Sequence, residues 1–269
     1  MTEAAATRHR PARHTPGKPC WASLLVHGLA DCQDFYRELF GWEFRPGPQQ
    51  MGPYVRALAE GHEVAGLGQM KPGVHHRAAW LPYLASDDAD ATAARIHECG
   101  GTVAVGPLDA EEEGRIAIVS DPVGAAFGVW QGGAHIGLKP SAAGAPGTPV
   151  WYELVTVETS FAGKFYGSVF GHHAEAVVSG EFDYLTLHVG GEPVAGVHGV
   201  GEELPRDKGP HWKTYFSVAD TDAAARTAQR IGGRVVEPPR DSPYGRLATL
   251  ADREGAEFCV IHSGGSGAD

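Results

Sequence analysis

The chain has 269 residues and a formal net charge of −11, and its 42% hydrophobic and 20% charged residues are ordinary for a globular protein. Lysine and arginine do not cluster outside the first 18 residues, which argues against a nucleic-acid partner, and no apolar run reaches the roughly 18 residues of a membrane span. The four cysteines (Cys20, Cys32, Cys99 and Cys259) lie far apart with no CxxC pair, so we expect a reduced, cytoplasmic protein without a disulfide framework.

The first predicted elements are a strand and an amphipathic helix. Residues 1–18 are polar and basic, without the apolar stretch of a secretory signal, and are expected to form a disordered tail. A strand is predicted over Cys20–Val26, and apolar residues from Leu29 to Phe40 then recur at steps of three and four, as in a helix. Gly41 follows where a helix C-terminus favours a positive φ. Three strands are predicted next, over Trp42–Arg45, Tyr54–Ala59 and Glu63–Gln69.

The same order of elements begins again after a linker at Lys71–His76. A strand over Trp80–Ala85 leads into a helix over Ala89–Cys99, which ends at a pair of glycines. Three further strands are predicted around Thr102–Val105, Ile116–Ser120 and Ala126–Gln131. The first half of the chain therefore holds two βαβββ units.

The second half repeats the first at an offset of 130 to 132 residues. Chance would not preserve so many aromatic and glycine positions: Trp21 recurs as Trp151, Tyr54 as Tyr184, Tyr83 as Tyr215, Phe40-Gly41 as Phe170-Gly171 and Gly100-Gly101 as Gly232-Gly233. The predicted fold is α+β, with four βαβββ modules in one chain forming two curved, cup-like mixed sheets. We assign a tail to 1–18, a first domain to 19–132, a linker to 133–148, a second domain to 149–263 and a tail to 264–269.

Three groups of motifs resemble the vicinal oxygen chelate superfamily, which contains glyoxalases, bleomycin-resistance proteins and extradiol dioxygenases. They are FYRELFGWEF with its echo FYGSVFGHHA, VAGLG with VAGVHG, and SDPVGAAFGVWQ with ADREGAEFCVIH. The resemblance covers about residues 19–263 and implies two glyoxalase-like domains. It implies little about the reaction, because the same scaffold hosts lyases, isomerases, dioxygenases and non-catalytic drug-sequestering proteins.

Metal enzymes of this superfamily take a His or Glu from the first strand, a Glu from the fourth, a His from the strand after the linker and a Glu from the last. In the first half of this chain, those positions fall at Trp21, at Gly66 or Gly68, near Leu81 and at Gly128. In the second half, they fall at Trp151, at Gly196 or His198, near Lys213 and at Cys259. Because tryptophan, glycine and leucine side chains cannot ligate a metal, we predict no cofactor. The alternative is a divalent metal held by His198, His211 and Glu153.

The parity of these strand positions predicts which side chains line each cup, because alternate residues of a strand share a face. The predicted ligand-binding residues are Trp21, Ser23, Tyr54, Tyr83 and Trp130 in the first half, and Trp151, Tyr184, Tyr215 and Cys259 in the second. Aromatic walls suit a flat aromatic or apolar ligand, which gains affinity from stacking and burial. The alternative is that the duplication simply repeats aromatic core residues.

Glu153 is the predicted catalytic residue. Its counterpart in the first half is Ser23, so the repeat itself does not require an acid at this position. An apolar setting beside Trp151 favours the protonated carboxyl group, which suits a general acid or base. The alternative is a structural ion pair with Lys213 or Arg246.

Two functions follow with equal weight, both placed in a cavity between the curved sheets. The first is metal-independent binding or sequestration of a small aromatic or apolar molecule. The second is a non-metal enzyme, lyase-, isomerase- or oxygenase-like, acting on an aldehyde, a quinone or a polyketide-type substrate. The alternative to both is a divalent-metal-dependent lyase, isomerase or dioxygenase. We expect a small-molecule ligand and no nucleic-acid or membrane partner. A monomer is feasible, because four modules can pair within one chain, and a homodimer is the alternative.

Overall fold

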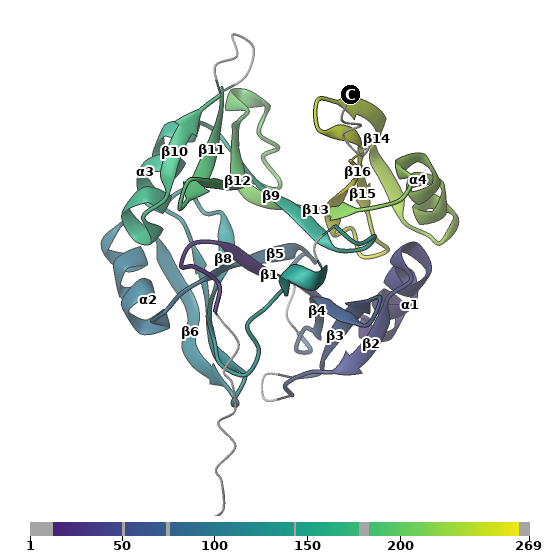
Figure 1. Cartoon of the computed structure of the whole chain (residues 1–269). Coiled ribbons are helices and arrows are strands. Elements are labelled where there is room, and N and C mark those ends of the chain that lie inside the picture. The colour runs from purple at the N-terminus through teal and green to yellow at the C-terminus, as the bar shows by residue number, and fades with distance from the viewer. Residues whose placement is uncertain (1–12, 50–51, 74–75, 143, 178–182, 264–269) are drawn as a thin grey trace, which may run out of the picture.

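A computed structural model of the chain describes residues 13–49, 52–73, 76–142, 144–177 and 183–263. Two eight-stranded mixed sheets, each with two helices, make up the molecule (Figure 1). The predicted α+β fold with two curved sheets is confirmed. The described helices are all too short or too polar to span a membrane.

Sheet A is built by the first half of the chain. Its modules comprise β1 (Pro19–Val26), α1 (Leu29–Phe40), β2 (Glu43–Pro46), β3 (Tyr54–Ala59) and β4 (His62–Gln69), then β5 (Trp80–Ala85), α2 (Ala89–Glu98), β6 (Thr102–Ala110), β7 (Gly114–Ser120) and β8 (Ala126–Gly132). The strand order β2-β3-β4-β1-β5-β8-β7-β6 places the two modules side by side. Antiparallel pairing of β1 with β5 joins them at the centre of the sheet.

Sheet B repeats this arrangement with the second half. Its elements are β9 (Pro149–Thr156), α3 (Thr159–Phe170), β10 (His173–Ala176), β11 (Asp183–Val189), β12 (Glu192–Gly199), β13 (His211–Ser217), α4 (Thr221–Arg230), β14 (Arg234–Ser242), β15 (Gly245–Ala251) and β16 (Glu257–His262). The strand order β10-β11-β12-β9-β13-β16-β15-β14 matches that of sheet A position for position. Two 3-10 turns, Pro140–Ala142 and Gly201–Glu203, lie in the connections.

The helix ends follow local sequence signals and one contact between the halves. Gly41 and Gly171 close α1 and α3 with φ values of 71° and 73°, in the left-handed region predicted for the first of them. The backbone N–H groups of His27 and Gly28, which precede α1, donate to the carboxylate of Glu254 over 2.8 and 2.6 Å. An acid from the second half therefore satisfies donors at the start of a helix in the first.

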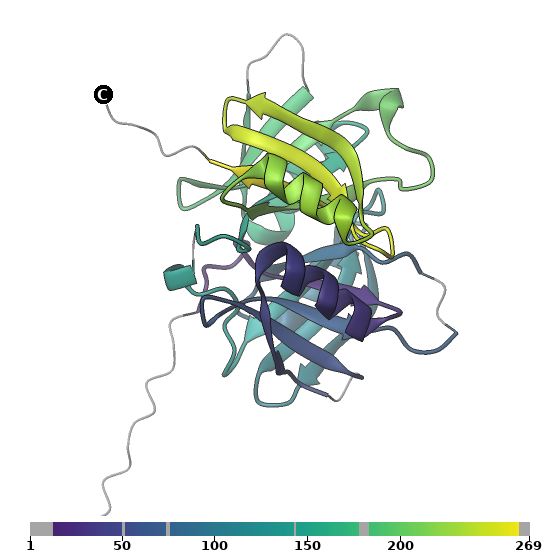
Figure 2. The same cartoon turned by 90° about the vertical axis from the view of Figure 1, so that its right-hand side faces the viewer.

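A shared hydrophobic core fills the space between the two sheets. Phe216 of β13 lies 4.9 Å from the ring of Trp80 in β5 and 5.2 Å from Phe40 in α1, measured between ring centroids. Tyr166 of α3 lies 5.5 Å from Phe127 in β8 in the same way. Figure 2 shows α1 and α4 side by side where the two halves meet. The prediction of a cavity between the sheets is therefore wrong, because aromatic side chains from both halves occupy that space.

Two buried tyrosines tie the halves together by equivalent hydrogen bonds. The hydroxyl of Tyr36 donates to Asp252 over 3.2 Å and accepts from the indole of Trp80 over 2.9 Å. The hydroxyl of Tyr166 donates to Asp121 over 3.4 Å. Burial raises the pKa of both aspartates. These polar contacts fix the register of one half against the other within an otherwise apolar core.

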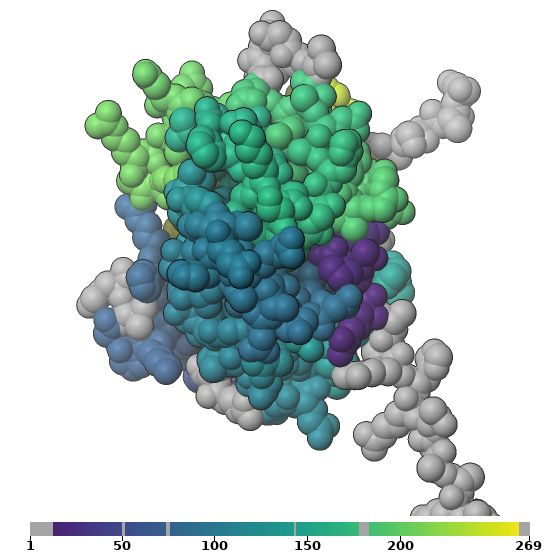
Figure 3. Space-filling view, turned by 90° about the vertical axis from the view of Figure 1, so that its left-hand side faces the viewer, coloured from purple at the N-terminus to yellow at the C-terminus, as the bar shows by residue number. Residues whose placement is uncertain are grey.

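The N-terminal segment runs onto the second half of the chain. Lys18 forms an ion pair with Glu192 at the start of β12, and Figure 3 shows the purple N-terminal segment against the green second half. Residues 1–12 of the expected N-terminal tail lie outside the described residues, as does the expected tail at 264–269.

Candidate functional site

Each sheet turns one face away from the shared core, and these two faces carry the predicted site residues. We call them cup A, the face of sheet A with Trp21, Ser23, Tyr54, Tyr83 and Trp130, and cup B, the face of sheet B with Trp151, Glu153, Tyr184, Tyr215 and Cys259. Strand pairing makes several of these residues direct neighbours. Tyr215 is paired with Trp151 on one side and with Cys259 on the other.

Cup A is packed like a small core. The indole N–H of Trp21 donates to the Tyr54 hydroxyl over 3.1 Å, and the Ser23 hydroxyl lies 2.8 Å from the same atom. Trp21, Tyr83 and Trp130 are only 5%, 7% and 8% exposed. This is the packing expected from the core-residue alternative.

A segment after β8 closes cup A. The ring of His135 meets Trp21 edge-on, with 4.6 Å between the ring centroids. Its backbone carbonyl accepts a hydrogen bond from Trp130 over 3.0 Å, and its Nδ1 lies 3.3 Å from a carboxylate oxygen of Glu63. The residues around His135, at the start of the predicted linker, thus form a lid over this face. The glycine- and alanine-rich sequence around His135 gave no periodic signal for that role.

Cup B is more open and holds a buried carboxylate. Glu153 is 9% exposed, whereas Trp151, Tyr184 and Tyr215 around it are partly exposed. The hydroxyls of Tyr184 and Tyr215 each donate to a different oxygen of Glu153 over 3.1 Å. The Tyr184 hydroxyl also hydrogen-bonds the side chain of Trp151. We call this arrangement of one carboxylate and two phenols the Glu153 clamp.

Burial and the neighbouring carboxylate fix the protonation of the clamp's phenols. Burial is the main cause that raises the pKa of Tyr184 and Tyr215, and the charge of Glu153 adds to it. Both hydroxyls therefore keep their protons at neutral pH and serve as donors. A carboxylate with two such donors is held in one orientation, with its remaining lone pairs available to a ligand.

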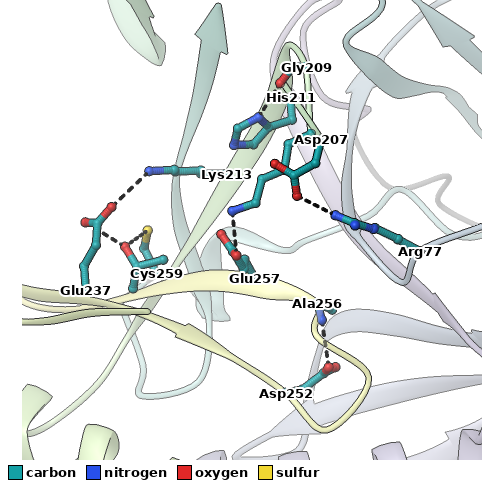
Figure 4. A network of polar contacts seen from close by, with 12 residues as sticks. Arg77, Asp207, Gly209, His211, Lys213, Glu237, Asp252, Ala256, Glu257 and Cys259 are labelled. Atoms are coloured by element: carbon teal, nitrogen blue, oxygen red, sulfur yellow. Dashed lines mark hydrogen bonds and ion pairs between the residues drawn. The ribbon is translucent and has the colours of Figure 1, made fainter. Parts of the chain in front are cut away.

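The predicted ion pair of Glu153 with Lys213 or Arg246 is not formed. Lys213 is the cross-strand neighbour of Glu153, but its amine extends to Glu237 of β14 at 3.8 Å (Figure 4). Arg246 pairs with Asp222 in α4 and with Asp241 in β14. The tyrosines take the place of the expected cation, a contact that strand register alone could not reveal.

Cys259 lies beside the clamp as a buried thiol. It is 1% exposed, and its sulfur lies 3.6 Å from the hydroxyl of Thr249, which in turn lies 3.0 Å from Glu237. Burial raises the pKa of the Cys259 thiol to about 11. The thiol is therefore protonated at neutral pH and poorly nucleophilic.

The residues present do not fit the metal centre of the superfamily. A Cβ atom added to Gly66 or Gly196 would lie 1.6 or 1.9 Å from the hydroxyl of the adjacent tyrosine, and one added to Gly128 would lie 2.1 Å from the Tyr83 ring. Aromatic side chains thus fill the space that a ligating side chain would need.

The alternative metal set does not come together either. His198 and His211 lie on either side of Val155 in the strand pairing, on the same face as Glu153. Within the described part of the chain, no three His, Cys, Asp or Glu residues are grouped so that they could hold a metal ion.

Two hollows lie away from both cups. One of about 190 Å³ is lined by charged residues near the β6–β7 turn, including Glu111 and Arg115. The other, of about 160 Å³, lies between His62 and Lys139. Neither is lined by a predicted site residue, so the candidate site rests on the partly exposed face of cup B.

Comparison with known proteins gives a consistent family match. The model of the glyoxalase-like domain matches residues 23–130 and again residues 155–261. DnrV of Streptomyces peucetius, named as an anthracycline biosynthesis protein, is 37% identical over 93% of this chain and 94% of its own length. CFP32 of Mycobacterium tuberculosis, which carries the word glyoxylase in its name, is 35% identical over 93% of this chain and 96% of its own length.

A solved structure shares the fold at low sequence identity. The Mn(II)-bound glyoxalase from Novosphingobium aromaticivorans superposes with a TM-score of 0.63 at 17% identity, over 93% of this chain and 83% of its own. At that identity the likeness concerns the arrangement of the modules and leaves the chemistry of the site open.

Proposed function

Because the chain belongs to the glyoxalase-like family of the vicinal oxygen chelate superfamily, we propose that cup B binds a small planar aromatic molecule without a metal, with Glu153 as its polar anchor. The observation that carries the proposal is the Glu153 clamp, in which two phenols hold a buried carboxylate beside a partly exposed indole. Partly exposed rings can stack on a flat ligand, and one oriented acceptor can fix its position.

Cup A is not part of the proposed site. Its rings contact one another and His135 covers them, so a ligand would have to displace protein contacts to enter. The predicted ligand-binding residues of cup A are therefore assigned to packing in this proposal. Those of cup B are assigned to the ligand, with Cys259 forming part of the floor.

We infer the substrate class from the aromatic walls of the site, with support from the name of one relative. DnrV is named for anthracycline biosynthesis, and anthracyclines are polycyclic aromatic polyketides. A ring system of that kind matches the aromatic walls of cup B. In a sequestering protein Glu153 would only accept a hydrogen bond. In an enzyme it would move a proton on a quinone, aldehyde or polyketide-type substrate, which its position beside the ligand allows.

Titration with 1,8-dihydroxyanthraquinone tests the proposal. We expect saturable quenching of tryptophan fluorescence in the wild type, unchanged by EDTA, and a loss of affinity of about tenfold in Glu153→Gln. Ser23→Ala alters the equivalent position of cup A and should leave the affinity unchanged. Quenching that never saturates, or an equal loss in both variants, would contradict the assignment to cup B.

Two further measurements separate the remaining functions. Mass spectrometry of the recovered probe distinguishes sequestration, which returns it unchanged, from turnover. Metal analysis of protein purified without chelators should give substoichiometric divalent metal. Metal at full occupancy whose removal abolishes binding would overturn the metal-independent proposal and favour the metal-dependent alternative.

A further inference from the structure

We infer that the ligand of cup B carries a protonated amine that pairs with Glu153. This inference rests on the proposed function, since it names the polar group of the molecule that cup B binds. The juxtaposition behind it is a buried carboxylate that pairs with no lysine or arginine of the described residues and that lies beside three aromatic side chains.

The lysines near Glu153 form ion pairs with other glutamates of this face. Glu237 forms an ion pair with Lys213 at 3.8 Å, and Glu257 forms one with Lys208 at 2.6 Å (Figure 4). Each lysine thus already has an acidic partner. Among the described residues, no lysine or arginine is paired with Glu153, whose carboxylate accepts hydrogen bonds from the two phenols. A buried carboxylate is stabilised far more by a cation than by neutral donors alone.

The aromatic rings around Glu153 also favour a ligand with an ammonium group. Trp151, Tyr184 and Tyr215 are partly exposed, and the faces of aromatic rings attract organic cations. An ammonium group on the edge of a flat aromatic molecule would therefore meet a carboxylate while its ring system stacks on the indole. The net charge of −11 adds a long-range attraction for cationic ligands.

An organic cation suits this site better than a metal ion. A divalent metal requires several ligating side chains grouped together, which the described residues do not provide, and the groups bonded to Glu153 are two phenols that keep their protons. An ammonium group needs only acceptors around it. The carboxylate supplies a charged one, and phenol oxygens can supply neutral ones.

The test compares two probes of equal shape on the unmodified protein, 2-naphthylmethylamine and 2-naphthylmethanol, by fluorescence titration at neutral pH. The amine is expected to bind at least about tenfold more tightly. This comparison needs no variant and is therefore independent of any effect of mutation on folding. Equal affinity for the two probes would overturn the inference and leave the proposed function standing. Failure of both probes to bind saturably would contradict the proposed function itself, and the inference with it.

The assignment to Glu153 is tested by Glu153→Gln, which keeps the shape of the side chain, removes its charge and replaces one acceptor oxygen by an NH2 donor. We expect the variant to lose the preference for the amine, because the alcohol should bind about tenfold more weakly than it does to the wild type and the amine about a hundredfold more weakly. Ser23→Ala, at the equivalent position of cup A, should keep the full preference. A preference that survives in Glu153→Gln would place the amine elsewhere and overturn the assignment.

Discussion

Cup A and cup B occupy equivalent places in the two halves but differ in what their side chains contact. Each keeps a hydrogen-bonded indole and phenol over a glycine: Trp21, Tyr54 and Gly66 in cup A, and Trp151, Tyr184 and Gly196 in cup B. The residue beside this trio is Ser23 in cup A and Glu153 in cup B. The Ser23 hydroxyl hydrogen-bonds the phenols of Tyr54 and Tyr83, just as Glu153 accepts from those of Tyr184 and Tyr215. The two cups therefore differ in the group held between the phenols, which is a neutral hydroxyl in cup A and a carboxylate in cup B.

The two cups also differ in how far their aromatic rings are exposed. In cup A the segment after β8 brings His135 over Trp21 and buries the rings. In cup B the rings of Trp151, Tyr184 and Tyr215 are partly exposed. The comparison shows that duplication preserved the aromatic scaffold, while one substitution and one connecting segment made the faces chemically distinct.

The largest expected effect separates packing from binding in the two tryptophans. Trp21→Ala removes a buried ring from cup A and should lower the free energy of unfolding by about 3–5 kcal/mol. Trp151→Ala removes a partly exposed ring and should cost about 1–2 kcal/mol, but weaken binding of a planar ligand at least about tenfold. Urea unfolding and fluorescence titration of both variants measure the contrast. Similar stability losses with no effect on binding would remove the distinction between the cups.

The arrangement of strands and helices could be predicted because the residues that determine it recur in both halves of the sequence. The recurrence of Trp21 as Trp151 and of Tyr83 as Tyr215 revealed the duplication, and strand parity placed Trp151 and Glu153 on one face. The αL end of α1 followed from Gly41. These features depend on local backbone geometry and on the period of a strand, which sequence encodes directly.

The contacts of the site could not be predicted in the same way. Whether Glu153 meets a lysine or a tyrosine depends on the reach of each side chain and on Glu237, which arrives from a distant strand and takes Lys213. The lid over cup A depends on His135 in a segment without periodicity. The filled space between the sheets depends on how the halves pack, as Phe216 does against Trp80. All three are set by tertiary contacts between segments far apart in the chain.

A smaller effect is expected where a methyl group is added beneath the tyrosine of each cup. In Gly196→Ala the new Cβ would lie 1.9 Å from the Tyr184 hydroxyl, so the ring must move and the Glu153 clamp loses a donor. We expect about 1–3 kcal/mol of destabilisation and weaker ligand binding. Gly66→Ala displaces Tyr54 in cup A and should cost similar stability while the affinity stays unchanged. Urea unfolding and titration of both variants check this, and weaker binding in Gly66→Ala would mean that the cups are coupled.

The smallest expected effect is a change in stability at low pH that involves cup A only. The contact with His135, together with the charge of Arg56, holds the pKa of Glu63 at about 2, below the usual value of about 4.5. A carboxyl group whose pKa is lowered by folding stabilises the fold above its usual pKa, and this stabilisation disappears as the pH falls through about 2. The equivalent position in the second half is Pro193, which cannot titrate. Glu63→Gln should therefore be less stable than the wild type at pH 7, and the difference should shrink at pH 3. Urea midpoints at both pH values measure it, with Ser23→Ala as a variant whose difference from the wild type should not change. A gap for Glu63→Gln that stays constant with pH would mean that the charge of Glu63 does not hold the lid.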